Sequence, residues 1–140
     1  MKTKRISVGE VEYVAFGLAK ELMTWDEPIP AFGTRFPNIL ESCVDTPFSA
    51  FSRKDLYRGL VGKASVLFYL MIKNHPFQNR NKRIAVMTLL YFLHKNGKWL
   101  NINKESLYKF ARGIAGSRAS AREKVVTQIR ATLYKYLVDA

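Results

Sequence analysis

Residues 75–83 decide the architecture of this chain, and they read His75-Pro76-Phe77-Gln78-Asn79-Arg80-Asn81-Lys82-Arg83. Pro76 disfavours helical geometry at His75, so the stretch begins as a loop. The run that follows, from Ile84 to Leu93, is apolar except for Thr88. Such a run predicts a helix over about residues 81–95 that is apolar around its whole circumference and therefore buried. The pattern thus predicts a loop that leads into the central helix of a helical bundle.

The first turn of this predicted helix is rich in hydrogen-bond donors. A helix N-terminus presents unpaired backbone N–H groups and the positive end of the helix dipole, so it is suited to bind an anion. Lys82 and Arg83 favour a phosphate chain as that anion, because without one they lie against an unfavourable dipole. We expect Asn81, Lys82, Arg83 and the N–H groups of residues 79–82 to surround the phosphates. The alternative is that the two cations are solvated charges flanking the helix.

Apolar residues at helical spacing predict five more helices around this one, giving an all-α domain of about six helices. Ser52 with Asp55, and Ser120 with Glu123, are interpreted as capping boxes that open two of them. Asn96-Gly97 ends the central helix. The expected helices cover about residues 8–24, 38–44, 52–74, 81–95, 107–114 and 120–137.

Between the first two helices, three prolines and Gly33 interrupt the helical pattern from Trp25 to Pro37. Phe32, Gly33, Thr34, Arg35 and Phe36 are compatible with a short hairpin or edge strand. An exposed edge can accept the extended backbone of a partner as an additional strand.

Length and composition indicate one globular domain over residues 1–140. The chain has 140 residues, 48% of them hydrophobic, and a single cysteine, Cys43. One cysteine excludes a disulfide framework and a cysteine zinc site, and a buried thiol in a reducing cytoplasm is expected. No apolar segment follows the basic N-terminus, so we expect no signal peptide, no membrane span and a cytoplasmic location.

The net charge of +12 implies an anionic partner, such as a nucleotide, a nucleic acid or an acidic protein. Residues 56–104 carry nine basic side chains and no carboxylate, whereas residues 1–55 are nearly balanced. Charge alone does not discriminate between these partners.

The stretch 75–83 resembles the central motif of the Fic/Doc family, which reads roughly His-Pro-Phe-x-(Asp/Glu)-(Gly/Ala)-Asn-(Gly/Lys)-Arg. The positions that match are His75, Pro76, Phe77, Asn81 and Arg83. At the position of Lys82, the sequence resembles the Doc (death-on-curing toxin) branch of the family, because the Fic branch has glycine there. Upstream, the segments 32–35 and 40–42 resemble the Doc sequence that leads out of the flap, so the likeness covers about residues 8–97. It implies a helical bundle with a short β-hairpin flap.

This resemblance implies a transferase that uses ATP or another nucleoside triphosphate with Mg²⁺. His75 would be the base that takes the proton of a target hydroxyl, since histidine exchanges protons near neutral pH. Asn81, Lys82 and Arg83 would hold the phosphates, and the flap, residues 32–36, would dock the target. Fic members transfer AMP, whereas Doc transfers the γ-phosphoryl group to elongation factor Tu and is restrained by an antitoxin. Phe77 is expected to anchor the loop in the core, and His94, the other histidine, to be structural.

Two positions depart from the family pattern. Asn79 replaces an acidic metal ligand, and an amide oxygen holds a hard cation less well than a carboxylate does. Arg80 replaces Gly or Ala, and it either supplies part of the metal's positive charge or blocks the nucleotide. The alternative function is therefore a catalytically weakened or inactive binding domain, whose basic face holds an anionic protein or nucleic acid.

Overall fold

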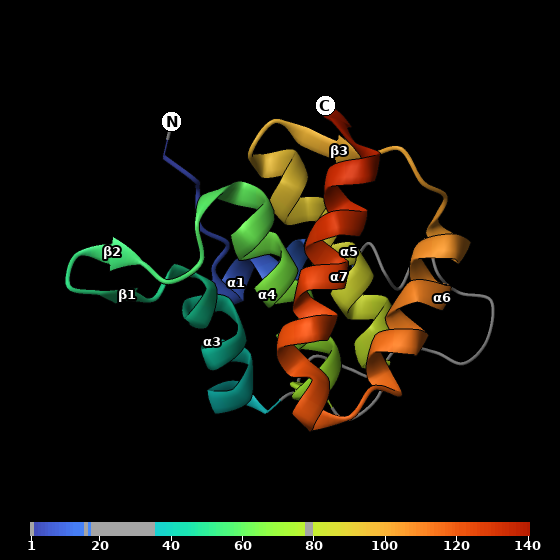
Figure 1. Cartoon of the computed structure of the whole chain (residues 1–140), viewed down its shortest axis with the longest axis horizontal. Coiled ribbons are helices and arrows are strands. Elements are labelled where there is room, and N and C mark those ends of the chain that lie inside the picture. The colour runs from blue at the N-terminus through green and yellow to red at the C-terminus, as the bar shows by residue number, and fades with distance from the viewer. Residues whose placement is uncertain (1, 16, 18–35, 78–79) are drawn as a thin grey trace.

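The computed structural model describes residues 2–15, 17, 36–77 and 80–140. Within them it is a bundle of helices with two small antiparallel sheets (Figure 1). In chain order the helices of eight or more residues are α3 (Pro37–Asp45), α4 (Gly59–Lys73), α5 (Asn81–Lys95), α6 (Lys104–Ala115) and α7 (Arg122–Tyr136). The predicted all-α class with a small β element is confirmed.

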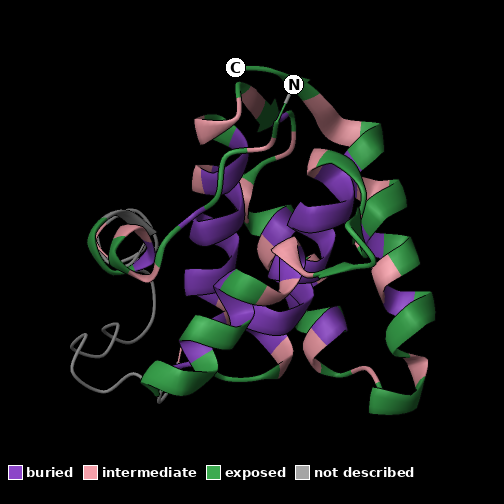
Figure 2. Cartoon of the chain, turned by 90° about the vertical axis from the view of Figure 1, so that its left-hand side faces the viewer, coloured by how far each residue is buried: buried purple, intermediate pink, exposed green. Residues whose placement is uncertain are grey.

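Helices α4 and α5 form the centre of the bundle, as the apolar run from Ile84 to Leu93 predicts. Most of their residues are buried, including Phe68, Met71, Leu89 and Phe92. Figure 2 shows these two helices almost wholly as buried ribbon, with the exposed residues on the elements around them. Helix α5 begins and ends where the sequence predicts, and Gly97 follows it with a positive φ of 78°.

Two predicted capping boxes are wrong. Ser52 and Asp55 open no helix: they belong to a hairpin of β1 (Ala50–Phe51) and β2 (Lys54–Asp55), and α4 begins only at Gly59. The carboxylate of Asp55 instead accepts a hydrogen bond from Lys63, so a contact within the folded chain replaces the local cap.

The second wrong cap lies before α7. Residues Ala119–Ala121 form a 3-10 turn, and Ala121 precedes α7 without a side-chain cap. Leu137 also leaves the last helix, since it begins β4 (Leu137–Asp139), which pairs with β3 (Lys98–Leu100).

The first predicted helix is confirmed only at its start. Helix α1 (Val8–Glu10) has a capping box of Ser7 and Glu10, and a π-helical turn (Val11–Ala15) continues it. The remainder of the predicted helix, and Phe32 to Arg35 of the predicted flap, lie outside the described residues. Phe36, the last flap residue, precedes α3 and is exposed.

Two bulk expectations also meet the structure. Cys43 is buried, and this burial raises the pKa of its thiol to about 12, so it is inert near neutral pH. Among the described residues, no helix has both the length and the apolar character needed to cross a membrane.

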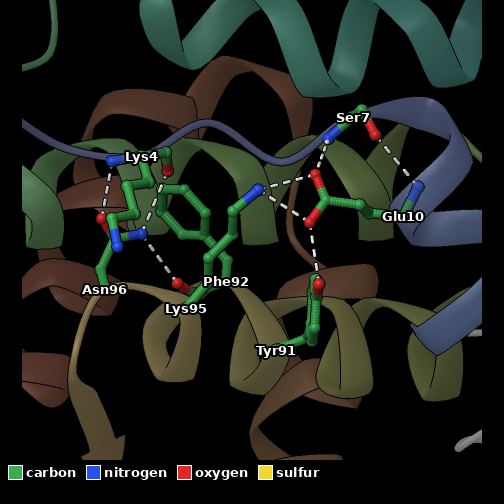
Figure 3. A network of polar contacts seen from close by, with 7 residues as sticks. All are labelled: Lys4, Ser7, Glu10, Tyr91, Phe92, Lys95 and Asn96. Atoms are coloured by element: carbon green, nitrogen blue, oxygen red, sulfur yellow. Dashed lines mark hydrogen bonds and ion pairs between the residues drawn. The ribbon is translucent and has the colours of Figure 1, made fainter.

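The N-terminal segment is tied to α5 by the carboxylate of Glu10 (Figure 3). Lys95 Nζ lies 2.7 Å from both carboxylate oxygens, and Tyr91 Oη donates to Oε2 at 2.8 Å. The backbone N–H of Ser7 donates to Oε1 at 3.1 Å. Burial alone raises the pKa of Glu10, but these hydrogen bonds outweigh it and hold the pKa below its ordinary value of 4.5.

Replacing Glu10 by Gln should therefore reduce the free energy of unfolding by about 1–3 kcal/mol at pH 7, because a charge-assisted network is lost. A lowered carboxyl pKa stabilises the fold above the unfolded-state value, and this contribution is lost as pH falls through the folded-state value. The difference between the two proteins should thus stay constant from pH 7 down to about pH 5, and it should shrink as pH falls below 4.5 in urea titrations. Glu12→Gln, on an exposed neighbour, is the control and should change little at either pH.

Candidate active site

The loop between α4 and α5 carries the predicted base. Helix α4 ends at Lys73, with Asn74 as its cap, and His75 then adopts a left-handed conformation with φ of 50°. Pro76 and Phe77 are buried, whereas His75 is exposed. The backbone turn therefore places the imidazole outside the bundle while the next two residues anchor the loop inside it.

Asn81 holds this loop in place. Its Oδ1 accepts the backbone N–H of Phe77 at 2.9 Å, and its Nδ2 donates to the carbonyl oxygen of Phe77 at 3.0 Å. Asn81 is only 5% exposed and Phe77 is fully buried, so these bonds satisfy buried backbone groups. The structure thus gives Asn81 a positioning role, while its predicted contact with phosphate stays a prediction.

Asn81 also reaches the histidine. Its Nδ2 lies 3.4 Å from Nδ1 of His75, at the outer limit of a hydrogen bond. An amide NH₂ group only donates, so Nδ1 must be the acceptor in this contact. The neutral ring that fits this arrangement carries its proton on Nε2.

The three predicted cationic residues do not share one environment. Arg80 has a left-handed backbone with φ of 61° as the residue before α5, and Arg80 and Lys82 are each partly exposed. Arg83 is 1% exposed, and its guanidinium lies 5.8 Å from the ring centroid of Tyr108 in α6, within cation–π range. The sequence predicts Arg83 as a phosphate ligand and gives no signal for its burial against Tyr108. Its use as a phosphate ligand stays a prediction.

The loop is also joined to the end of the predicted flap. The backbone N–H of Phe36 donates to the carbonyl oxygen of Pro76 at 2.6 Å. Phe36, the last residue of the predicted flap, therefore lies directly beside the motif loop, and residues 32–35 lie outside the described part of the chain. His94, in contrast, lies near the end of α5, exposed, with its ring packed edge-on against Trp99.

The described residues do not fit a divalent metal site. They contain no group of three or more His, Cys, Asp or Glu side chains placed to hold a metal ion. Asn79, the predicted replacement for an acidic ligand, lies outside the described residues. Since residues 56–104 have no carboxylate, the charge that a hard cation requires is missing from the sequence around the motif.

A model of the Fic/DOC family matches residues 15–93, more than half of the chain and the whole of the motif loop. The chain belongs to the Fic/DOC family. Members of this family generally transfer nucleotide-derived groups to proteins. Searches of curated proteins and of solved structures found no match for the chain.

The role of Asn81 in the Fic/DOC motif can be tested by its removal. Asn81→Ala removes both side-chain hydrogen bonds to the buried backbone of Phe77, so the free energy of unfolding should fall by about 1–3 kcal/mol. Asn81→Asp keeps the acceptor and loses the donor, so its free energy of unfolding should lie between those of the native chain and of Asn81→Ala. Asn101→Ala, an exposed amide, is the control for chemical denaturation. If Asn81→Ala is as stable as the control, the two bonds from Asn81 to the backbone of Phe77, which we call the Asn81 clamp, do not hold the loop.

Proposed function

We propose that this Fic/DOC protein is a toxin of the Doc type, which transfers a phosphoryl or nucleotidyl group from a nucleoside triphosphate to a protein hydroxyl. The observation that carries the proposal is an exposed His75, held beside the buried Asn81. Asn81 begins a helix whose first turn also carries Lys82 and Arg83. Lys82, where the Fic branch has glycine, favours the Doc branch. A translation factor, elongation factor Tu by this resemblance, is the proposed target, and an acidic antitoxin is the proposed inhibitor.

In the proposed reaction, the target hydroxyl oxygen attacks a phosphorus atom of the nucleotide while His75 takes the hydroxyl proton. Attack at the γ-phosphorus breaks the bond between this atom and the oxygen that bridges the β- and γ-phosphates, and ADP leaves. Attack at the α-phosphorus releases pyrophosphate. Lys82, Arg80 and the N–H groups at the start of α5 stabilise the negative charge on the phosphate oxygens. Arg83 joins them where the bound nucleotide reaches it.

A second candidate is a domain that keeps this fold and binds an anionic partner without catalysis. The absence of carboxylates from residues 56–104 favours it, because it weakens ordinary use of Mg²⁺. The two candidates differ in whether any phosphate label is transferred. Incubation with ATP labelled at the α- or the γ-phosphate, together with elongation factor Tu or a cytoplasmic extract, measures this directly. Label from the γ-position alone supports phosphoryl transfer, and no protein label from either position supports the binding domain.

His75→Ala should reduce this transfer by about 10²–10⁴-fold, because general-base catalysis contributes that much. The fold should be unchanged, since the imidazole is exposed. His94→Ala is the matched control: it removes the other histidine, also exposed and on the helix that follows the motif, and should keep full transfer. Equal transfer by the His75 variant and the native chain would remove His75 from the mechanism.

Asn79→Asp should make transfer more dependent on Mg²⁺, because a carboxylate adds a full negative charge where the amide offers only a dipole. Arg80 can pair with the new carboxylate, so the double variant Asn79→Asp with Arg80→Gly is the companion. Affinity for ATP should be measured by calorimetry, once with Mg²⁺ and once with EDTA. The difference between these two affinities should be larger for the double variant than for the native chain. A double variant that binds ATP no better and transfers nothing would favour the binding-domain candidate.

A further inference from the structure

The hairpin of β1 and β2 projects from the helical body (Figure 1) and exposes apolar surface that the bundle does not use. Phe51 is 74% exposed and Leu56, directly after the hairpin, is 57% exposed. Ser52 and Arg53, the two residues of the turn, both have positive φ angles, of 51° and 67°. Positive φ in residues other than glycine costs free energy, so the turn is held in a conformation that the residues themselves do not favour.

A buried lysine fixes the hairpin to the body. Lys63 in α4 is only 4% exposed, and its Nζ donates to Asp55 Oδ2 at 2.8 Å and to the carbonyl oxygen of Tyr57 at 2.6 Å. A two-stranded hairpin alone is marginally stable, so these bonds hold it in position. The exposure of Phe51 is therefore a property of an anchored element and not of a frayed one.

A basic cavity adjoins the base of this hairpin. Its volume is about 400 Å³, and its lining includes Lys2, Arg5 and Lys63, with Asp55 as its carboxylate. Arg5 and Lys63 both lie over the ring of Phe48, at 4.8 and 5.7 Å from its centroid. The cavity lining thus combines three cations with one anion, and Arg5 also pairs with Asp45 at 3.3 Å. Arg53 and Lys54 of the hairpin add positive charge nearby, so cations still outnumber carboxylates here.

This surface is remote from the motif loop. The cavity lies at the start of α4 and His75 follows its end, so the 15 residues of α4 separate them by about 22 Å at 1.5 Å per residue. Nucleotide bound at α5 would leave the hairpin accessible, and neither the base nor the phosphate ligands proposed above belong to it.

We propose that the β1–β2 hairpin and the adjoining basic cavity form a docking surface for an acidic segment of a partner protein. Carboxylates of the segment meet Lys2 and Arg5 at the cavity, while Lys63 stays bound to Asp55. The apolar residues of the segment cover Phe51 and Leu56. Exposed apolar residues beside positive charge fit a segment that supplies both chemistries. Leu56 favours a peptide over nucleic acid, because an aliphatic side chain offers bases no stacking surface. The free edges of the hairpin can also pair with extended backbone.

The test uses the full chain and three fluorescein-labelled probes at low salt, measured by anisotropy. They are a ten-residue peptide of alternating Glu and Leu, the same peptide with Gln in place of Glu, and a ten-nucleotide oligo-thymidine. We expect the Glu/Leu peptide to bind most tightly. Phe51→Ala with Arg53→Ala should weaken it by at least about tenfold, since an anchor residue and a charge are both lost. Lys2→Gln should also weaken binding of the Glu/Leu peptide, because it removes a positive charge from the cavity and leaves the hairpin unchanged.

Tyr134→Ala with Arg130→Ala is the matched control, because it removes an exposed aromatic and an exposed arginine from α7 with the same change in net charge. It should alter peptide affinity by less than about twofold. The substituted residues are exposed in both double variants, so thermal unfolding should be unchanged. The proposal is overturned if the control loses as much peptide affinity as the hairpin variant, or if the Gln/Leu peptide binds as tightly as the Glu/Leu peptide. It is also overturned if the hairpin variant loses more affinity for the oligonucleotide than for the Glu/Leu peptide.

Discussion

The packing of α4 against α5 is the constraint on which the rest of the structure depends. Both helices are buried around most of their circumference, so other elements must cover them on every side. The loop that joins them is therefore held at both ends by the most buried parts of the chain. Fully burying a side chain such as Phe77 stabilises the fold by about 1.5–3 kcal/mol, which anchors the start of this loop to the bundle.

The positive charges in the first turn of α5 interact unfavourably with the helix dipole. Lys82 and Arg83 lie in the first turn, at the positive end of the helix dipole, where cations are disfavoured. Arg83 is in addition withdrawn from solvent, and a buried guanidinium is costly unless its surroundings compensate. An anion at this helix end would reverse the sign of the dipole interaction. The position of Lys82 and Arg83 against the dipole is thus consistent with the proposed phosphate ligand, while the ring of Tyr108 compensates part of the burial of Arg83.

The sequence predicted the centre of the molecule better than its edge. Helix α5 and the end of α4 followed from an apolar run, Pro76 and Gly97, because these signals act through burial and backbone geometry. The β1–β2 hairpin could not be predicted in this way. Its turn residues, Ser52 and Arg53, lack the Gly, Asn or Asp that marks such a turn, and Asp55 is held by Lys63 from the next helix. The burial of Arg83 against Tyr108 likewise depends on a helix that lies far away in sequence.

The contact between Asn81 and His75 links the buried and the exposed parts of the loop. Asn81 can face His75 only with its donor group, because its acceptor is committed to the N–H of Phe77. The lone pair on Nδ1 of the imidazole is therefore directed at Asn81, and Nε2 carries the proton of the neutral ring. A base must offer a free lone pair to the hydroxyl it deprotonates. In the proposed reaction, the weak 3.4 Å contact must therefore break, or the ring must exchange tautomers, before His75 can accept a proton. Since that contact is long and the bonds to Phe77 are short, the imidazole can be released without disturbing the buried clamp that positions it.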